Sequence, residues 1–334
     1  MTAQPPADAS GLAVRLPAPL VTLLRRRDSN VFFLLFVLVA AIIFFTIQSP
    51  YFFDDRNAFN IGRAVSITGI AAAFATLLMI SGGLDLSIGA IMNASGLAAA
   101  VIMVDPENSI ILAFTIALGI SAFIGFSNGI IVTKIGVNPI IATIGMQFVV
   151  RGMTLATRSG SALVRDRTFL ELGQGELAIG TLEIPVPVIL MLTTMLLCYL
   201  VLRFTQFGKY IYAIGDNASA CRRAGINVAG MRIALYTLSG LGAGFAGIVL
   251  AGLTGAGIPY AAGSELSVIS AVILGGVSLS GGVGVVQGTL LGVLLVGVLK
   301  NGMTLLNINA NWQMVVEGSV LMIAVSLDQL KQRI

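Results

Sequence analysis

Residues 266–299 read LSVISAVILGGVSLSGGVGVVQGTLLGVLLVGVL, and none of these 34 positions carries a charged side chain. A helix needs about 20 apolar residues to cross a bilayer, so this run is too long for one span. Its centre, from Gly275 to Gly282, reads GGVSLSGG, and glycine weakens a helix interior. We therefore expect two membrane spans with a break between them at this point.

The composition of the whole chain agrees with a membrane protein. Of 334 residues, 57% are hydrophobic and 10% are charged, and the mean hydropathy is +0.97. A soluble domain carries about 25% charged residues, so the composition excludes a soluble enzyme and a disordered chain. The 39 glycines are scattered through the apolar runs, where they allow helix backbones to approach closely. The expected fold is an all-α integral membrane bundle.

The remaining apolar runs complete a set of about ten transmembrane helices. These runs are 31–47, 64–80, 86–104, 110–133, 135–150, 184–202, 233–253 and 312–327. Run 135–150 is one of the two shortest, and Pro139 interrupts it. This leaves open whether the run spans fully or is broken and partly re-entrant.

Lysine and arginine in the loops set the orientation of a membrane protein. Arg25-Arg26-Arg27 precedes the first run, so we place the N-terminus in the cytoplasm, and ten spans return the C-terminus to the same side. Inside segments then hold 12 of the 19 basic residues and five of the 15 acidic ones, whereas outside segments hold seven and ten. Topology thus explains the net charge of +4, and nucleic-acid binding is not needed to account for it.

A single transmembrane domain over residues 31–327 is expected to fill most of the chain. Residues 1–30 contain four prolines and are expected to form a flexible cytoplasmic tail, and residues 328–334 a short cytoplasmic C-terminal tail. The largest loops are about 151–183 outside and 203–232 inside, and neither is long enough for a separate soluble domain.

Residues that carry chemistry are scarce in this chain. Histidine is absent, and the two cysteines are not expected to pair, because Cys198 lies in an apolar run and Cys221 in a basic loop. We therefore expect no catalytic constellation, no metal site and no cofactor. No expected span has a central acidic residue or lysine, which counts against a secondary transporter driven by an ion gradient.

The inside loop 203–232 holds the most specific local signals. Asn217 can cap a short helix over 218–224, and Gly225 can end it. One interpretation is an ordinary positively charged anchor. The other is a docking helix, with small residues that approach a groove on a soluble partner and arginines that meet its acids. The candidate coupling residues are Gly215, Asn217, Ala218, Ala220, Arg222, Arg223, Ala224 and Gly225.

Several motifs together resemble the permease subunits of ribose-type, monosaccharide-importing ABC transporters. GGLDLSIG at 82–89 is similar to that family's GGIDLS stretch, and the inside loop resembles its coupling segment, which ends here in GINV at 225–228. The run 275–292 and VLKNG at 298–302 match the family's C-terminal pattern. The resemblance covers about residues 30–327.

The resemblance implies a type II ABC-importer permease with ten helices in the bacterial inner membrane. The implied partners are ABC ATPase subunits, an extracytoplasmic sugar-binding protein, membrane lipid and a second permease copy, as a homodimer or a heterodimer. LSGG at 279–282 copies four letters of the ABC ATPase signature, but the chain lacks a GxxxxGK[ST] phosphate loop. We therefore assign ATP hydrolysis to a partner. The sequence does not name the sugar, and the related branched-chain amino acid permeases are the nearest alternative.

Polar side chains within membrane spans are costly and are functional candidates. Those expected to line a pathway for sugar hydroxyls are Asp85, Asn93, Asn128, Asn138 and Gln147. The alternatives are interhelical hydrogen bonding and, for Asp85, a helix cap at the membrane interface. Glu317, five residues beyond Trp312, is expected to reach the outer headgroups.

Overall fold

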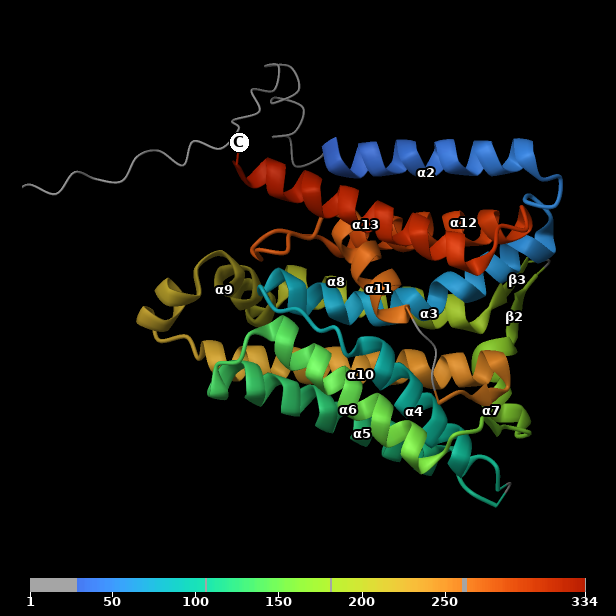
Figure 1. Ribbon diagram of the computed structural model, residues 1–334, viewed down its shortest axis with the longest axis horizontal. Coiled ribbons are helices and arrows are strands. Elements are labelled where there is room, and N and C mark those ends of the chain that lie inside the picture. Colours follow the sequence, from blue (N-terminus) through green and yellow to red (C-terminus); the bar gives the residue numbers. More distant parts are fainter. Residues whose placement is uncertain (1–28, 106, 181, 260–262, 334) are drawn as a thin grey trace, which may run out of the picture.

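The computed structural model describes residues 29–105, 107–180, 182–259 and 263–333. Figure 1 shows that these residues form a bundle in which most helices lie along the long axis of the molecule. The predicted tail over 1–30 lies outside the described residues, except for Ser29 and Asn30, which begin the first described helix.

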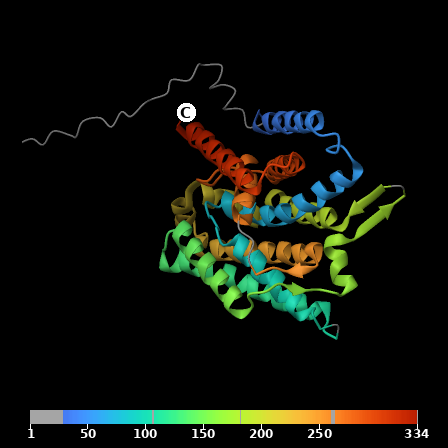
Figure 2. The same cartoon turned by 45° about the vertical axis from the view of Figure 1, so that its right-hand side comes forward.

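Helices form almost all of the described structure. They are α2 (Ser29–Gln48), α3 (Asp55–Ile80), α4 (Ile88–Ile102), α5 (Ile110–Ile130) with its π-helical continuation η1 (Ile131–Ile135), α6 (Pro139–Thr157), α7 (Arg167–Gln174), α8 (Val186–Phe204), α9 (Gln206–Arg223), α10 (Val228–Thr254), α11 (Ser264–Leu274), α12 (Val286–Leu305) and α13 (Ala310–Arg333). Four short strands form two antiparallel pairs. These are β1 (Ala162–Leu163) with β4 (Ala256–Gly257), and β2 (Glu176–Ile179) with β3 (Leu182–Pro185). Figure 2 shows the β2–β3 hairpin projecting beyond the helices.

Helix α10 is the centre of the packed bundle. It packs against α3, α4 and α5, and its Leu235 and Tyr236 side chains are fully buried. A Cβ at Gly247 would overlap the backbone carbonyl of Met92 on α4, and a Cβ at Gly240 would overlap that of Ser121 on α5. The glycines therefore let neighbouring backbones touch, as the composition predicts.

The run 266–299 divides as predicted. Helix α11 ends at Leu274, α12 begins at Val286, and residues 275–285 form the break between them. Four glycines of the break have positive φ values, at positions 276, 281, 282 and 284. Such a backbone conformation is readily adopted only by glycine, which explains why the break falls here.

The run interrupted by Pro139 is helical without a break from Pro139 onward. Pro139 occupies the first helical position of α6, where its missing N–H is not needed. The Asn138 Oδ1 atom accepts a hydrogen bond of 2.9 Å from the Ile140 amide and caps the helix. The helix continues to Thr157, beyond the predicted end at residue 150, whereas residues 136–138 of the run lie outside it.

Six described helices are long and apolar enough to cross a membrane, namely α3, α5 with η1, α6, α8, α10 and α12. Residues Phe32–Gln48 of α2, together with α4 and α11, are apolar but shorter. The fold is therefore the predicted all-helical membrane bundle. At the C-terminal end, α13 continues to Arg333, so the predicted tail from residue 328 is helical as far as that residue.

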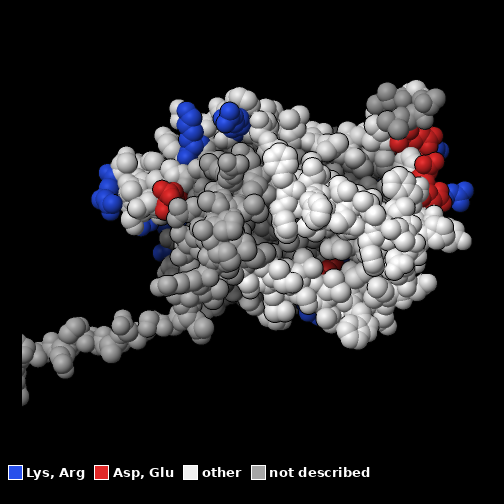
Figure 3. All heavy atoms as spheres, turned by 90° about the horizontal axis from the view of Figure 1, so that it is seen from above, with Lys and Arg blue, Asp and Glu red and all other residues white. Residues whose placement is uncertain are grey.

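The two ends of the bundle differ in charge. In Figure 1, α9 lies at one end of the long axis, and α7, β2 and β3 lie at the other. Figure 3 shows that most of the visible Lys and Arg side chains gather at the α9 end, and most of the visible Asp and Glu side chains at the opposite end. The bundle thus has the charge asymmetry that the loops predict.

Candidate functional site

Helix α9 contains a kink at Asn217. The backbone of Asn217 leaves the helical region, with φ −150° and ψ 88°. Its Oδ1 atom accepts a hydrogen bond of 2.9 Å from the Ala220 amide, which is the geometry of an N-terminal cap. Residues 218–223 therefore form a separate short segment, which we call the distal α9 segment. The cap is where the sequence predicts it, whereas the helical residues 206–216 before it lie in what was expected to be a loop.

A glycine ends the distal α9 segment. Gly225 has a φ of +83°, and its amide donates to the Arg222 carbonyl at 3.1 Å. The Ile226 amide donates to the Cys221 carbonyl at 3.0 Å. This pair of bonds is close to the Schellman arrangement, in which a left-handed glycine closes a helix. The predicted stop at Gly225 is therefore present.

The distal α9 segment has an inner and an outer side. Ala218 and Cys221 contribute to a small apolar cluster with Ile214, Ile226 and Val228. Ala218 is half-buried and packs against this cluster, so this side of the segment holds it against the bundle. Cys221 is likewise buried in a helix and not in a loop.

The outer side carries the remaining candidates. Arg222, Arg223, Ala224 and Gly225 are exposed, and Ala220 is half-buried. This outer side is basic, shallow and rigidly held from behind. It is a surface on which an acidic groove of another protein could seat.

Three chain segments meet beneath the distal α9 segment, at Ile80, Gly215 and Gly282. The Gly282 amide donates to the Ile80 carbonyl at 2.8 Å. A Cβ at Gly215 would overlap both that carbonyl and the Gly282 backbone. We call this contact the three-segment junction, because it joins the end of α3, the middle of α9 and the break between α11 and α12.

Further contacts fasten the same region. The Tyr212 hydroxyl donates to the Gly284 carbonyl at 2.8 Å. Gly82 of the stretch GGLDLSIG and Gly281 of the stretch GGVSLSGG have φ values of +79° and +85°. A Cβ at Gly281 would lie 2.8 Å from the Gly82 amide nitrogen. The two motifs therefore meet in space, and a displacement of α9 acts on both.

Asp85 is the most buried acid in the described structure. It lies in the loop between α3 and α4, with 1% of its surface exposed. Its Oδ1 atom accepts hydrogen bonds from the Ser87 amide at 2.9 Å and the Ser87 hydroxyl at 2.5 Å, and the Ser239 hydroxyl donates to Oδ2 at 3.4 Å. Burial raises the pKa of the Asp85 carboxyl group, and the hydrogen bonds from Ser87 and Ser239 lower it by less.

Asn128 joins this polar cluster from α5. Its Nδ2 atom donates to the Ser87 hydroxyl at 2.9 Å and lies 3.5 Å from Asp85 Oδ1. The sequence candidates Asp85 and Asn128 are therefore brought together. The α3–α4 loop is contacted by Asn128 of α5 and by the Tyr236 hydroxyl of α10, which donates to the Leu84 carbonyl at 3.1 Å.

The other pathway candidates lie apart from this cluster. Asn93 on α4 is 6% exposed and lines a small cavity with Gly96 and Gly247. Asn138 is exposed and caps α6, so the expectation that it lies within a span is wrong, because the helix begins after it. Gln147 on α6 donates from Nε2 to Glu265 Oε1 on α11 at 3.0 Å.

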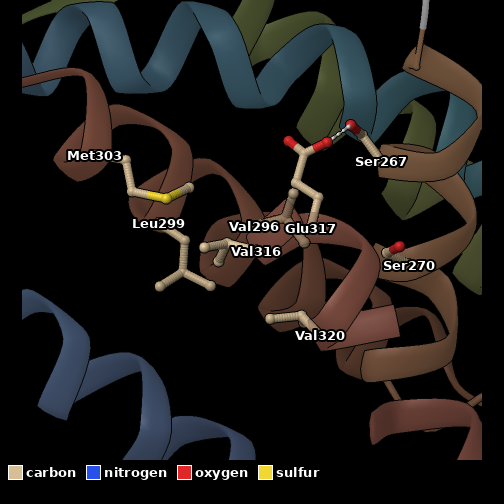
Figure 4. Close-up of a pocket in the computed structure, with 8 residues that line it drawn as sticks. All are labelled: Ser267, Ser270, Val296, Leu299, Met303, Val316, Glu317 and Val320. Atoms are coloured by element: carbon tan, nitrogen blue, oxygen red, sulfur yellow. Dashed lines mark hydrogen bonds between the residues drawn. The ribbon is translucent and has the colours of Figure 1, made fainter. Parts of the chain in front are cut away.

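Glu317 on α13 is mostly buried, with 17% of its side chain exposed. Figure 4 shows its carboxylate turned toward Ser267 of α11, whose hydroxyl donates to Oε2 at 3.4 Å. The Lys300 Nζ atom of α12 lies 3.3 Å from Oε1. Because α13 packs on α11 and α12, this side chain ties three helices together.

Comparison with known proteins places these features in context. The sequence profile of the family described as "Branched-chain amino acid transport system / permease component" matches residues 57–325. The ribose import permease protein RbsC of Escherichia coli K12 is 39% identical over 302 residues, which cover 89% of this chain and 93% of the relative. RbsC of Bacillus subtilis 168 is 40% identical over 304 residues, covering 89% and 91%.

A third relative carries a different sugar in its name. The L-arabinose ABC transporter permease protein AraH of Azospirillum brasilense is 33% identical over 300 residues, covering 89% of this chain and 87% of the relative. No solved structure matches this chain.

Proposed function

This chain belongs to the family of branched-chain amino acid transport system permease components, and we propose on that premise that it is the membrane permease of an ABC importer for a monosaccharide. The observation that carries the proposal is the sequence identity to ribose import permeases. It is 39–40% and extends over 89% of this chain. Named relatives that carry ribose and L-arabinose favour a pentose-like sugar over a branched-chain amino acid. The chain is a transport component and not an enzyme.

The importer needs partners that this chain does not replace. ABC ATPase subunits supply the energy, and an extracytoplasmic binding protein delivers the sugar. We further propose that two permease copies, identical or paired with a related chain, enclose the passage. The permease sequence has no phosphate-binding loop of its own. The conformational change of the permease must therefore come from its contact with the ATPase.

The proposed topology has ten membrane elements with both termini in the cytoplasm. The α9 end, which is rich in basic residues, faces the cytoplasm, and α7 with the β2–β3 hairpin faces outward (Figure 3). Helix α11, with eleven residues, is too short to span alone. In the proposed topology α11 and the glycine-rich break after it count as one interrupted element, of the kind found near substrate paths in transporters.

The proposed coupling element is the distal α9 segment. Its exposed Arg222, Arg223 and Ala224 form the docking surface for an ATPase groove, and its buried side is fixed to the bundle. The three-segment junction beneath it touches α3 and the break before α12. A push on the docking surface is therefore passed to two parts of the bundle without a flexible linker.

Uptake by cells tests the substrate class. A strain that lacks this permease and the same strain with the gene restored would be compared for uptake of labelled ribose, L-arabinose and leucine. We expect the loss of one monosaccharide's uptake, restored with the gene, and unchanged leucine uptake. Loss of leucine uptake with unchanged sugar uptake would contradict the proposal and favour the amino acid branch of the family.

A further inference from the structure

Glu265 contacts the middle of a membrane-spanning helix. Helix α6 has 19 residues, about 28 Å at 1.5 Å per residue, which matches the hydrocarbon thickness of a bilayer. Gln147, which donates to Glu265 Oε1 at 3.0 Å, lies one position from the midpoint of α6. The carboxylate of Glu265 is therefore close to the centre of the membrane.

The sequence does not reveal this depth. Glu265 immediately precedes the uncharged run 266–299, which suggests a position at the membrane surface. In the structure it lies in the first turn of the short helix α11, beside Gln147 of α6. The positive end of the α11 dipole favours a carboxylate at this place. Gly89 of α4 leaves room for it, because a Cβ there would overlap the carboxylate.

The two acids of this region are held differently. Glu317 has a cationic partner in Lys300 and a hydroxyl partner in Ser267 (Figure 4). Among the described residues, Glu265 has Gln147 as its hydrogen-bond partner and forms no ion pair. Its carboxylate therefore keeps acceptor capacity that the protein does not use.

The partial exposure of Glu265 indicates what it faces. Its side chain is neither fully buried nor neutralised by a cation, and a charged group at mid-membrane depth is expensive next to lipid chains. Such groups face a bundle interior or a water-filled space. The boundary between α6 and α11 at Glu265 is therefore not a lipid-facing surface.

We propose that Glu265 is a sugar-binding group of the passage and that Gln147 is its positioning residue. The carboxylate accepts hydrogen bonds from hydroxyl groups of the passing monosaccharide, and no covalent step is involved. A carboxylate can accept two neighbouring hydroxyls at once, which suits a polyol. The inference rests on the proposed function, because it assumes that a sugar crosses this bundle.

Labelling tests whether position 265 faces water. In a chain with Cys198→Ser and Cys221→Ser, we would place single cysteines by Glu265→Cys and Leu196→Cys. Leu196 lies at the middle of α8 and is 56% exposed, so it is a matched position expected to face lipid. The transporter assembled with its ATPase and binding protein in membrane vesicles is treated with a charged methanethiosulfonate reagent, with and without millimolar ribose.

The expected labelling separates the two positions. Position 265 should react at least tenfold faster than position 196, and a transported sugar should slow the reaction at 265 only. A reaction at 265 as slow as at 196 would overturn the proposal, and so would a fast reaction that no transported monosaccharide slows.

Import provides the second readout. Glu265→Gln keeps the shape of the side chain and is expected to lower sugar import per ATP hydrolysed by about tenfold, the effect of one hydrogen bond to a charged group. Glu317→Gln, the matched acid outside the proposed site, should lower it by less than twofold. Wild-type import by Glu265→Gln overturns the inference, whereas a wild-type transporter that imports no monosaccharide overturns the proposed function instead.

Discussion

Gly215→Ala is predicted to separate ATPase docking from sugar transport. The added methyl group would overlap the Ile80 carbonyl and the Gly282 backbone in the three-segment junction. Neither obstacle is a flexible side chain, so the backbones themselves must move apart. The docking surface at Arg222 and Arg223 lies on the outer side of α9 and is not touched by this substitution.

The size of the effect follows from the geometry. The junction must open by about 1 Å or more to restore van der Waals distances, and overpacking of this kind costs about 1–3 kcal/mol. The hydrogen bond of 2.8 Å between Gly282 and Ile80 would lengthen, which adds about 1 kcal/mol. A total near 3 kcal/mol corresponds to a shift of about a hundredfold against the closed junction.

The assay measures three quantities on one preparation. These are retention of the ATPase on purification, ATP hydrolysis stimulated by the binding protein, and sugar import into proteoliposomes. We expect Gly215→Ala to retain the ATPase at wild-type levels and to import sugar at least tenfold more slowly. Gly119→Ala on α5 is the control, because a Cβ there meets open space. Wild-type import by Gly215→Ala, at an unchanged ratio of sugar to ATP, would refute the role given to the junction.

Three further predictions concern docking, topology and the buried polar cluster. The Ala224→Glu variant should insert into the membrane normally but lose its ATPase on purification. Its affinity for the ATPase should fall by more than a hundredfold, because an unpaired buried charge costs about 3–5 kcal/mol. If this variant retains the ATPase and imports sugar normally, the docking role of the distal α9 segment is wrong and the segment is only a charged anchor. Ser161 and Ser219 are both exposed. A single cysteine at position 161 should react with an impermeant thiol reagent added outside intact cells. A single cysteine at position 219 should react only after the cells are permeabilised. Labelling of position 219 from outside would reverse the orientation. Asp85→Ala should lower the free energy of unfolding by about 1–3 kcal/mol, because its hydrogen-bond donors lose their acceptor. An unchanged midpoint of thermal aggregation in detergent would contradict this.

Local signals in the sequence predict the long apolar helices, whereas α7 and the first part of α9 lie in expected loops. The break in 266–299 follows from glycines that the structure holds at positive φ, and the kink and stop of α9 follow from Asn217 and Gly225. Each of these signals acts within a few residues of itself. Long apolar runs and capping residues are therefore readable without any knowledge of the bundle.

The placement of polar residues depends on contacts between distant segments and is not readable in this way. Asp85 looks like an interface cap, because nothing nearby shows that its loop is enclosed by α5 and α10. Asn138 looks like a residue within a span, because the apolar residues on both sides of it give no sign that α6 begins at Pro139. Glu265 was missed because its depth depends on where α11 begins in space. Its only sequence signal is an acid directly beside an uncharged run that contains a glycine break.

The central claim is that this chain is a sugar passage driven by a partner's ATP hydrolysis. Purified permease in proteoliposomes, with the ATPase enclosed and the liganded binding protein outside, measures this directly as uptake of a labelled monosaccharide. The account predicts uptake against a gradient that needs ATP, the ATPase and the binding protein together, and none under a proton or sodium gradient alone. Concentrative uptake by the permease alone under an ion gradient would contradict it.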